Sequence, residues 1–283
     1  MNRRQSLGGG AREFIPFKGK NVGVETPTYK GITSEVGWAF SPTKSKMAFT
    51  LAEVLITLGI IGVVAALTLP TLIQNHANKV VETRLMKFYS AINQAITLAE
   101  VDYGDREFWY DKYDDLDTDI KGRPVKGKTD REKWVNKYLA PYMKIIKTEY
   151  DDAGFPIFYL ADGGSFRYTH GTSLSDWRFY TSNNPKTCEK GLYWERTGSG
   201  RCSFSFIYGP SWLTINGSRV RTFEPYKYNW DGTLNGILEG TPRSDADGGG
   251  VRACNKSDQA YCTLYIQYNG LKIPDDYPFK VSY

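Results

Sequence analysis

The sequence predicts an α+β protein in which one long N-terminal helix is followed by an exported globular head with an antiparallel β-sheet. Three observations predict this class: a nearly uncharged apolar run at residues 49–73, an amphipathic helical period directly after it, and short strand-like segments with turn signals beyond residue 154. The chain has 283 residues, of which 24% are charged. It is therefore long enough to bury a core and has the charge content of a globular protein.

The net charge lies in the first 48 residues. This segment has eight basic and three acidic side chains, an excess of five, and the net charge of the whole chain is also +5. The rest of the chain is balanced, which argues against a polyanion-binding surface there. Residues 1–48 are rich in Gly, Lys and Arg without a sustained period, which predicts a disordered cytoplasmic leader that is removed on processing. Met47 is an alternative start to Met1, although a leader of two residues would lack Lys44 and Lys46.

The apolar run Phe49–Ile73 has 25 residues and one charge, Glu53. As a helix rising ~1.5 Å per residue it would span the ~30 Å hydrocarbon layer, and no other stretch is as long without charge. Lys44 and Lys46 precede it, which places the N-terminus in the cytoplasm and residues beyond 75 outside. The run is too long for an ordinary signal peptide, so an ordinary membrane anchor is the alternative. An anchor does not need a carboxylate that costs ~2.5 kcal/mol or more in hydrocarbon, so Glu53 indicates a function.

The segment Lys44–Gly62 reads KSKMAFTLAEVLITLGIIG and resembles the N-terminal motif of type IV prepilins and type II secretion pseudopilins. The resemblance implies that a prepilin peptidase cuts between Ala48 and Phe49 and then methylates Phe49. Glu53 becomes the fifth residue after the cut, the acidic position on which that family relies for assembly. Pro70 stands where the family's long helix commonly bends, as an interior proline should. The family usually has Gly before the cut, where this chain has Ala48.

The resemblance further implies a structural subunit that is processed at the bacterial inner membrane and assembled into a cell-surface pilus or periplasmic pseudopilus. Its head would serve adhesion, motility, DNA uptake or secretion, and whether it binds nucleic acid stays open. The implied partners are the prepilin peptidase and N-methyltransferase, other pilin subunits, an assembly ATPase and an inner-membrane platform. In the assembled bundle, Glu53 of one subunit would neutralise the α-amino group of Phe49 of a neighbour. No cofactor and no enzymatic activity are expected. The alternative is a non-polymerising, single-span, surface-anchored binding protein.

Four small residues in the run, Gly59, Gly62, Ala65 and Ala66, would allow other helices to approach closely, although ordinary membrane-helix composition explains them equally well. After the run, apolar residues recur at steps of three and four and predict an amphipathic continuation to about Val101, with residues 102–104 as a stop. They are Val81, Leu85, Phe88, Ile92, Ala95, Ile96 and Ala99. The predicted divisions are a leader at 1–48, a membrane or filament-core half at 49–73, an amphipathic half at 74–103 and a head at 104–283.

Within the head, the pattern predicts a second helix from Asp130 to about Ile146. Residues 155–160 and 165–168 flank Ala-Asp-Gly-Gly and predict a β-hairpin. Residues 202–208 and 263–268 alternate as strands do, and the polar, Gly-rich residues 223–253 predict a long loop. An Asn-Gly turn and an extended tail follow the last expected strand, as in many pilin-like heads.

All four cysteines, Cys188, Cys202, Cys254 and Cys262, lie in the expected head. An even number in an oxidising compartment predicts disulfides, for which three connectivities exist. Sequential pairing would close two short loops, each contributing ~2–3 kcal/mol by the loop-entropy model. A zinc site is the alternative, but no C-x-x-C pair is present.

Two further motifs invite a ligand. Residues 122–129 match the phosphate-loop pattern, but the preceding segment is acidic rather than a buried strand, and Thr129 with Glu132 forms a capping box that begins the second helix. Asp115, Asp117 and Asp119 imitate half of a calcium loop without its Gly and Glu. We expect neither a nucleotide site nor an EF-hand, while a looser calcium site at these residues, or at Asp245 and Asp247, stays open.

His170 is close in sequence to Ser173, Ser175 and Asp176, but no nucleophile elbow accompanies them, so a hydrolase is not expected. His76, directly after the apolar run, is expected to be solvated. The many aromatic residues, among them Trp177, Trp194, Trp212 and Trp230, fit core packing or a surface that binds a glycan or a protein partner.

Overall fold

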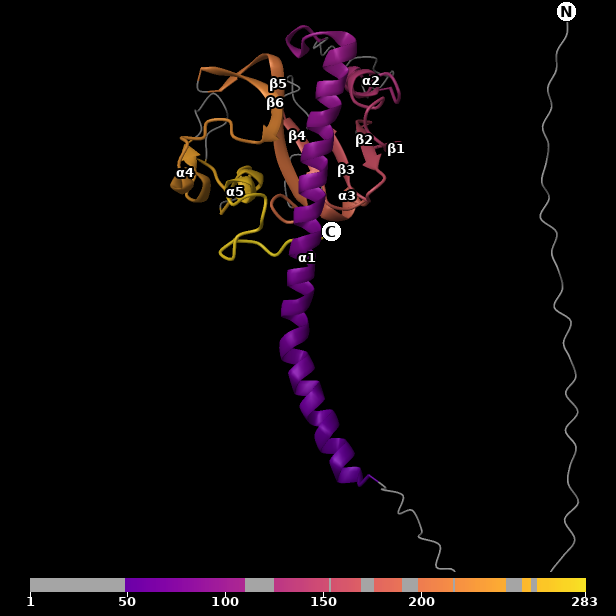
Figure 1. Ribbon diagram of the computed structural model, residues 1–283, viewed down its shortest axis with the longest axis vertical. Helices are drawn as coiled ribbons and strands as arrows, with labels where there is room; N and C mark the ends of the chain where they lie inside the picture. The colour runs from indigo at the N-terminus through magenta and orange to yellow at the C-terminus, as the bar shows by residue number, and fades with distance from the viewer. Residues whose placement is uncertain are drawn as a thin grey trace, which may run out of the picture. The chain divides into compact units, whose positions relative to one another are not determined.

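The computed structural model describes residues 49–109, 125–152, 154–168, 176–189, 198–215, 217–242, 251–255 and 259–283. The chain divides into two units, Met1–Leu51 and Ala52–Tyr283, and of the first only the last three residues are described. The fold is α+β, as predicted, with one long helix and a six-stranded antiparallel sheet (Figure 1). The helices are α1 (Leu51–Tyr103), η1 (Arg106–Phe108), α2 (Asp130–Tyr138), α3 (Pro185–Cys188), α4 (Leu234–Leu238) and α5 (Cys262–Tyr268). The strands are β1 (Ile145–Tyr150), β2 (Pro156–Leu160), β3 (Ser165–Tyr168), β4 (Asp176–Tyr180), β5 (Ser203–Ile215), β6 (Ser218–Pro225), β7 (Thr241–Pro242) and β8 (Val251–Arg252).

The amphipathic continuation of the apolar run is confirmed. The buried side chains of α1 are the seven that the period predicts, together with Ala77. The helix ends at Tyr103, and Gly104 follows with a φ of +77°, a left-handed conformation that a side chain would disfavour. The indole Nε1 of Trp109 donates to the carbonyl of Gly104 at 2.8 Å and so satisfies an acceptor just beyond the helix end.

The main sheet has the sequential order β1-β2-β3-β4-β5-β6, with every neighbouring pair antiparallel. The predicted hairpin at residues 155–168 is confirmed as β2 and β3. Its turn is closed by a hydrogen bond from the N–H of Leu160 to the carbonyl of Gly164 at 2.9 Å, and Gly163 has a φ of +86°. A side chain at Gly164 would lie 2.8 Å from the ring of Phe179, so this turn needs glycine for space as well.

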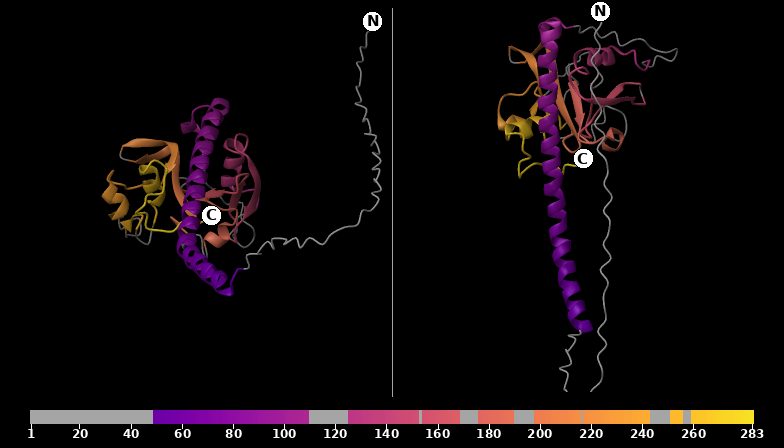
Figure 2. Two further views of the ribbon diagram at one scale, coloured as in Figure 1. Left: turned by 60° about the horizontal axis from the view of Figure 1, so that its bottom comes forward. Right: turned by 45° about the vertical axis from the view of Figure 1, so that its right-hand side comes forward.

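The core lies between α1 and one face of the sheet, which α1 crosses in each view of Figures 1 and 2. Phe88 of α1 is at its centre. Its ring is 4.3 Å from that of Phe179 on β4, and 5.5, 5.5 and 5.6 Å from those of Phe166, Phe206 and Phe223 on β3, β5 and β6. One aromatic side chain thus joins the helix to four strands. A second cluster joins α4 and α5 to β5 and β6 and includes both cysteines of the α5 disulfide.

Three polar contacts fasten α1 to the head below this core. Gln74 donates to the carbonyl of Val281 at 3.3 Å, and Glu82 accepts from the N–H of Ile273 at 2.9 Å. Arg84 donates to the carbonyl of Thr181. The C-terminal segment, expected to be an extended tail, therefore contacts α1 at two points.

The predicted helix from Asp130 to Ile146 is wrong in its second half. Helix α2 ends at Tyr138, and Ile145 begins β1. Pro141 lacks an N–H and excludes the preceding residue from helical geometry, and the apolar spacing that suggested a longer helix belongs to a turn and a strand.

The predicted strand at 263–268 is also wrong, because these residues form α5. Five of its seven residues are buried, so burial on every side removes the periodicity that distinguishes a short helix from a strand. The Asn-Gly turn that was expected after a strand, at Asn269 and Gly270, ends this helix instead. The expected loop at 223–253 contains the end of β6 together with α4, β7 and β8.

Replacing Phe88 by Ala is expected to lower the free energy of unfolding by about 3–5 kcal/mol, because it removes a buried ring that contacts four strands. The matched control is Met86→Ala on the exposed side of the same helix, for which a change within about 0.5 kcal/mol is expected. Urea unfolding of the full-length chain in a mild nonionic detergent, followed by tryptophan fluorescence, measures both. Equal effects of the two substitutions would contradict the central role of Phe88.

Candidate functional site

The N-terminal half of α1 is an apolar surface that nothing else in the described chain covers. No residue from Leu51 to Ile73 is buried, and Phe49 and Leu67 are 82% and 73% exposed. The most apolar 18-residue window has a mean hydropathy of 2.3, and among the described residues α1 is the one helix long and apolar enough to cross a membrane. A contiguous apolar surface of this size marks contact with lipid or with other protein chains.

The polar side chains within this half do not interrupt its apolar character. The hydroxyl of Thr57 donates to the carbonyl of Val54, and that of Thr68 to the carbonyl of Val64, each at 2.9 Å. Hydroxyls satisfied within the helix do not require water. Glu53 lies in the first turn, where the helix dipole favours a negative charge. This half therefore presents one carboxylate, at the end farthest from the head.

The two glycines of the run, Gly59 and Gly62, have no packing role among the described residues. A Cβ atom added to Gly59 or Gly62 would meet nothing within 4 Å. Glycine inside a helix costs roughly 0.8–1.0 kcal/mol relative to Ala, so its presence at both positions favours a role outside the folded monomer, such as close approach of another helix. Helix α1 continues through Pro70 and is curved along its N-terminal half (Figure 1).

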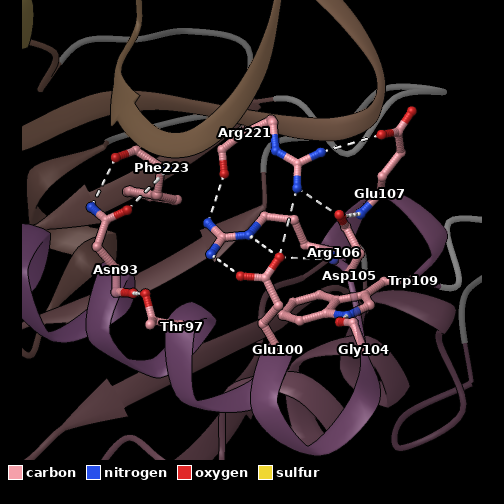
Figure 3. A network of polar contacts seen from close by, with 10 residues as sticks. All are labelled: Asn93, Thr97, Glu100, Gly104, Asp105, Arg106, Glu107, Trp109, Arg221 and Phe223. Carbon is pink, nitrogen blue, oxygen red and sulfur yellow. Dashed lines mark hydrogen bonds and ion pairs between the residues drawn. The ribbon is translucent and has the colours of Figure 1, made fainter.

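Near its C-terminal end, α1 is fastened to the edge strand β6 (Figure 3). The side-chain amide of Asn93 donates to the carbonyl of Phe223 at 2.9 Å and accepts from the N–H of the same residue at 3.1 Å. Arg106 donates to the carbonyl of Arg221 at 2.8 Å. The outward-facing backbone groups of two successive positions on the edge strand, Arg221 and Phe223, are thus hydrogen-bonded to side chains. Another strand cannot pair with β6 there.

An ionic network surrounds this contact. Arg106 binds the carboxylate of Glu100 through Nε at 3.0 Å and through Nη2, and Arg221 binds Asp105 at 2.7 Å and Glu107 at 3.2 Å (Figure 3). The hydrogen bond from Arg106 lowers the pKa of Glu100 below its ordinary value. The pKa of Asp105 is also lowered, first by the backbone N–H of Glu107 and then by Arg221. The network thus holds the turn after α1 against β6.

A groove of about 710 Å³ runs along α1 beside this network, with Tyr89, Gln94 and Leu98 among its lining residues. Two of its polar side chains, Arg106 and Asn93, already bind β6, and the amide of Gln94 donates to Ser90 in α1. The groove is therefore a surface feature of the helix–sheet contact rather than an arrangement for acid–base chemistry.

The cysteines form two disulfides, Cys188–Cys202 and Cys254–Cys262, which is the sequential one of the three connectivities. No free cysteine remains, and the described residues contain no group of three potential metal ligands. The disulfide interpretation is therefore confirmed, with sequential pairing.

The capping interpretation of the phosphate-loop pattern is confirmed for Thr129, whose hydroxyl accepts from the N–H of Glu132 at 3.2 Å. The carboxylate of Glu132 accepts from the N–H of Gly127 at 2.9 Å, rather than from Thr129 as in a standard capping box. Several residues that the sequence singled out lie outside the described residues. They are Ala48, residues 122–124, the aspartates at 115, 117, 119, 245 and 247, and His170, Ser173 and Ser175.

Of the aromatic residues singled out by sequence, Trp177 is buried in the core, and Trp230 is half-buried and donates to the carbonyl of Thr233. Trp194 lies outside the described residues. His76 is exposed, as expected, with its ring 6.1 Å from that of Tyr283.

The sequence did not reveal Asn93, Arg106 and Arg221 as a site. Asn93 had one local signal, since it is a poor helix former directly after the buried Ile92. Its partner Phe223 is 130 residues away, and no local pattern predicts that pairing.

Together, the fold and site define a disulfide-bonded α+β protein with one candidate membrane-spanning helix whose C-terminal half packs on the sheet. Residues 71–281 match a family of unknown function, DUF6613, and the chain belongs to this family. The match begins in α1 just after Pro70 and extends through the head. No curated protein and no solved structure matches the chain.

Asn93→Ala is expected to lower the free energy of unfolding by about 1–3 kcal/mol, because it leaves the N–H and carbonyl of Phe223 without their partner. Gln94→Ala is the control, since Gln94 is exposed and its side chain donates only to Ser90 in the same helix. Urea unfolding measures both, and dynamic light scattering tests whether the opened edge of β6 promotes association. If Asn93→Ala lowered the free energy of unfolding no more than Gln94→Ala, the contact with the edge strand would contribute little to stability.

Glu100→Gln tests the ionic network through pH. Because the folded-state pKa of Glu100 is lowered, its contribution to stability is present above its ordinary pKa and is lost as pH falls through the folded-state value. The stability difference between the original chain and Glu100→Gln is therefore expected to be larger at pH 7 than at pH 3. Asp152→Asn, in an exposed ion pair with Lys186, is the control for the loss of one carboxylate. A difference that is independent of pH would contradict the assigned role of Glu100.

Proposed function

We propose that this chain is a pilin-like structural subunit of a type IV pilus or type II secretion pseudopilus, processed by a prepilin peptidase and assembled through α1. The observation that carries the proposal is the single helix that is buried on a head along one half and wholly uncovered along the other. The prepilin-like sequence begins in the residues just before that uncovered half. A helix of this kind passes from the head into lipid, or into a bundle of other helices, without exposing backbone polar groups.

The processing chemistry belongs to the partner enzyme. The peptidase would hydrolyse the bond between Ala48 and Phe49 on the cytoplasmic side, and its methyltransferase activity would methylate the new α-amino group of Phe49. The uncovered half of α1 stays attached to the head after this cut. We expect no enzymatic activity from the chain itself.

Glu53 gives the assembled state its specificity. An α-amino group or a carboxylate moved alone into a low-dielectric bundle loses several kcal/mol of hydration, and pairing offsets that loss. Glu53 in the first turn of one subunit and the Phe49 amino group of a neighbour provide such a pair. Gly59 and Gly62 support the same arrangement, because they leave space beside the helix.

The proposed route begins at the bacterial inner membrane, where the precursor spans once with its N-terminus in the cytoplasm. An assembly ATPase and an inner-membrane platform would then extract it into a filament at the cell surface or in the periplasm. The other candidate function is a surface-anchored binding protein that never polymerises. It shares the membrane helix but requires neither processing nor Glu53, and those two properties distinguish the candidates.

Intact-mass and N-terminal peptide mass spectrometry test processing directly. The protein is recovered from a cell that has a prepilin peptidase, and from the same cell lacking that enzyme. A chain that begins at Phe49 with one added methyl group is expected only in the first. Recovery of residues 1–48 on the mature protein in both cells would favour the anchored binding protein.

Glu53→Ala is expected to reduce the filament fraction by roughly tenfold or more while leaving the cut at Phe49 intact, because it removes the counter-charge in the bundle. The matched control is Asp152→Ala, which removes an exposed carboxylate from the head. Sheared filaments are quantified by immunoblot and imaged by electron microscopy. Normal filament yield with Glu53→Ala would overturn this role.

A further inference from the structure

Two buried arginines face each other in the main sheet. Arg167 on β3 and Arg178 on β4 are directly opposite in the antiparallel register, and they are 6% and 2% exposed. Like charges directly opposite on neighbouring strands destabilise a sheet, and burial increases the repulsion because little water screens it. This pair therefore needs a counter-charge nearby.

The counter-charge comes from Glu189. Its carboxylate binds Arg178, accepts from Arg167 Nη2 at 3.4 Å, and accepts from the hydroxyls of Tyr180 at 2.7 Å and Ser203 at 3.0 Å. A second carboxylate, Asp151, binds Arg167 Nη1 at 2.9 Å. Burial raises the pKa of Tyr180, so its hydroxyl remains a neutral donor. The charge of Asp176 on β4 also acts on Arg178. Glu189 binds both arginines and comes from outside their two strands.

The position of Glu189 is set by a neighbouring disulfide. Glu189 follows Cys188 at the end of the four-residue helix α3, and Cys188 is bonded to Cys202. The next residue after Cys202 is Ser203, which begins β5 and pairs with Tyr180 of β4. The disulfide therefore places the Glu189 carboxylate beside the two hydroxyls that bind it. The ion pair of Lys186 with Asp152 also joins α3 to the head, but it is highly exposed and contributes little.

The chain also closes over this disulfide. A Cβ atom at Gly198 would lie 2.5 Å from the carbonyl oxygen and from Sγ of Cys188, and 2.9 Å from Sγ of Cys202. Only glycine lets the backbone come so close to the sulfur atoms. The segment around the disulfide is thus packed for the oxidised state.

We propose that the Cys188–Cys202 disulfide is a redox-linked switch that holds Glu189 against the buried arginine pair of the sheet. A dithiol reductant would transfer two electrons and two protons, cleave the S–S bond into two thiols and become a disulfide itself. Glu189 is then released, and Arg167 and Arg178 face each other with Asp151 bound to Arg167 and the charge of Asp176 near Arg178. Under the proposed function, this keeps the head from completing its fold in the reducing cytoplasm until it has been exported. That consequence rests on the proposed function, whereas the coupling between the disulfide and the arginine pair does not.

The test is a double-mutant cycle on the full-length chain in a nonionic detergent, measured by urea unfolding. Glu189→Gln in the oxidised protein is expected to reduce the folding equilibrium constant by roughly 100-fold or more. In a Cys188→Ala/Cys202→Ala background the same substitution is expected to change it by less than about threefold, because Glu189 is no longer held in place. An equal effect in both backgrounds would overturn the switch.

A matched control uses the other disulfide, which lies away from the arginine pair. In a Cys254→Ala/Cys262→Ala background, Glu189→Gln is expected to keep its full effect. Loss of the effect there as well would show that either disulfide merely supports the general stability of the head, and would overturn the specific coupling.

If the chain without the Cys188–Cys202 disulfide does not fold, a second comparison tests the coupling between the disulfide and the arginine pair. Arg178→Met/Glu189→Met leaves Arg167 paired with Asp151 and removes the need for Glu189. Removing the disulfide is expected to reduce the folding equilibrium constant of both chains. The fold-reduction in this neutralised chain is expected to be at least ten times smaller than in the original chain. An equal reduction, or complete unfolding of both, would mean that the disulfide acts through chain entropy alone and would overturn the proposal.

Discussion

The structure depends on one constraint: a single continuous helix must serve two environments. The C-terminal half of α1 gives its apolar face to the sheet, and Phe88 alone contacts aromatic rings on four strands. In the N-terminal half, no residue from Leu51 to Ile73 is buried, and the surface is apolar on all sides. Because the hydrogen bonds of a helix are internal, the same backbone satisfies both conditions without a break. The head therefore fixes the direction in which the uncovered half leaves it.

Buried or half-buried charges hold the sheet at two places, and in both the carboxylates come from segments outside the strands. At β6, the half-buried Glu100 near the end of α1 binds Arg106, which donates to the edge strand. Between β3 and β4, Glu189 from the segment after α3 binds two opposed arginines. Removing one member of such a group leaves an uncompensated charge, which costs more than the group contributes when intact. The sheet thus depends on segments whose positions are set by a helix end and a disulfide.

Local patterns predicted much of this fold. Hydropathy predicted the uncovered half of α1, and a period of three to four residues predicted the buried face of the helix. Turn residues predicted the β2–β3 hairpin. Prediction failed where local signals are ambiguous: α5 is buried on all sides, and the apolar spacing of α2 continues past Pro141 into a strand. The contacts of Asn93 and Glu189 were invisible because they depend on which distant strands become neighbours. Of the candidate site, the uncovered helix follows from composition, while the role of Glu53 rests on the resemblance to prepilins.

The polar contacts along α1 also have a mechanical consequence. Gln74 and Glu82 bind the C-terminal segment at Val281 and Ile273, Arg84 binds Thr181 after β4, and Asn93 binds Phe223 on β6. From Gln74 to Asn93 there are 19 residue steps, or ~29 Å of helix at ~1.5 Å per residue. Tension applied along α1 would load them side by side, in shear, rather than peel them apart one after another. Contacts that share a load must fail together, so the junction between helix and head is built to resist pulling along the helix axis.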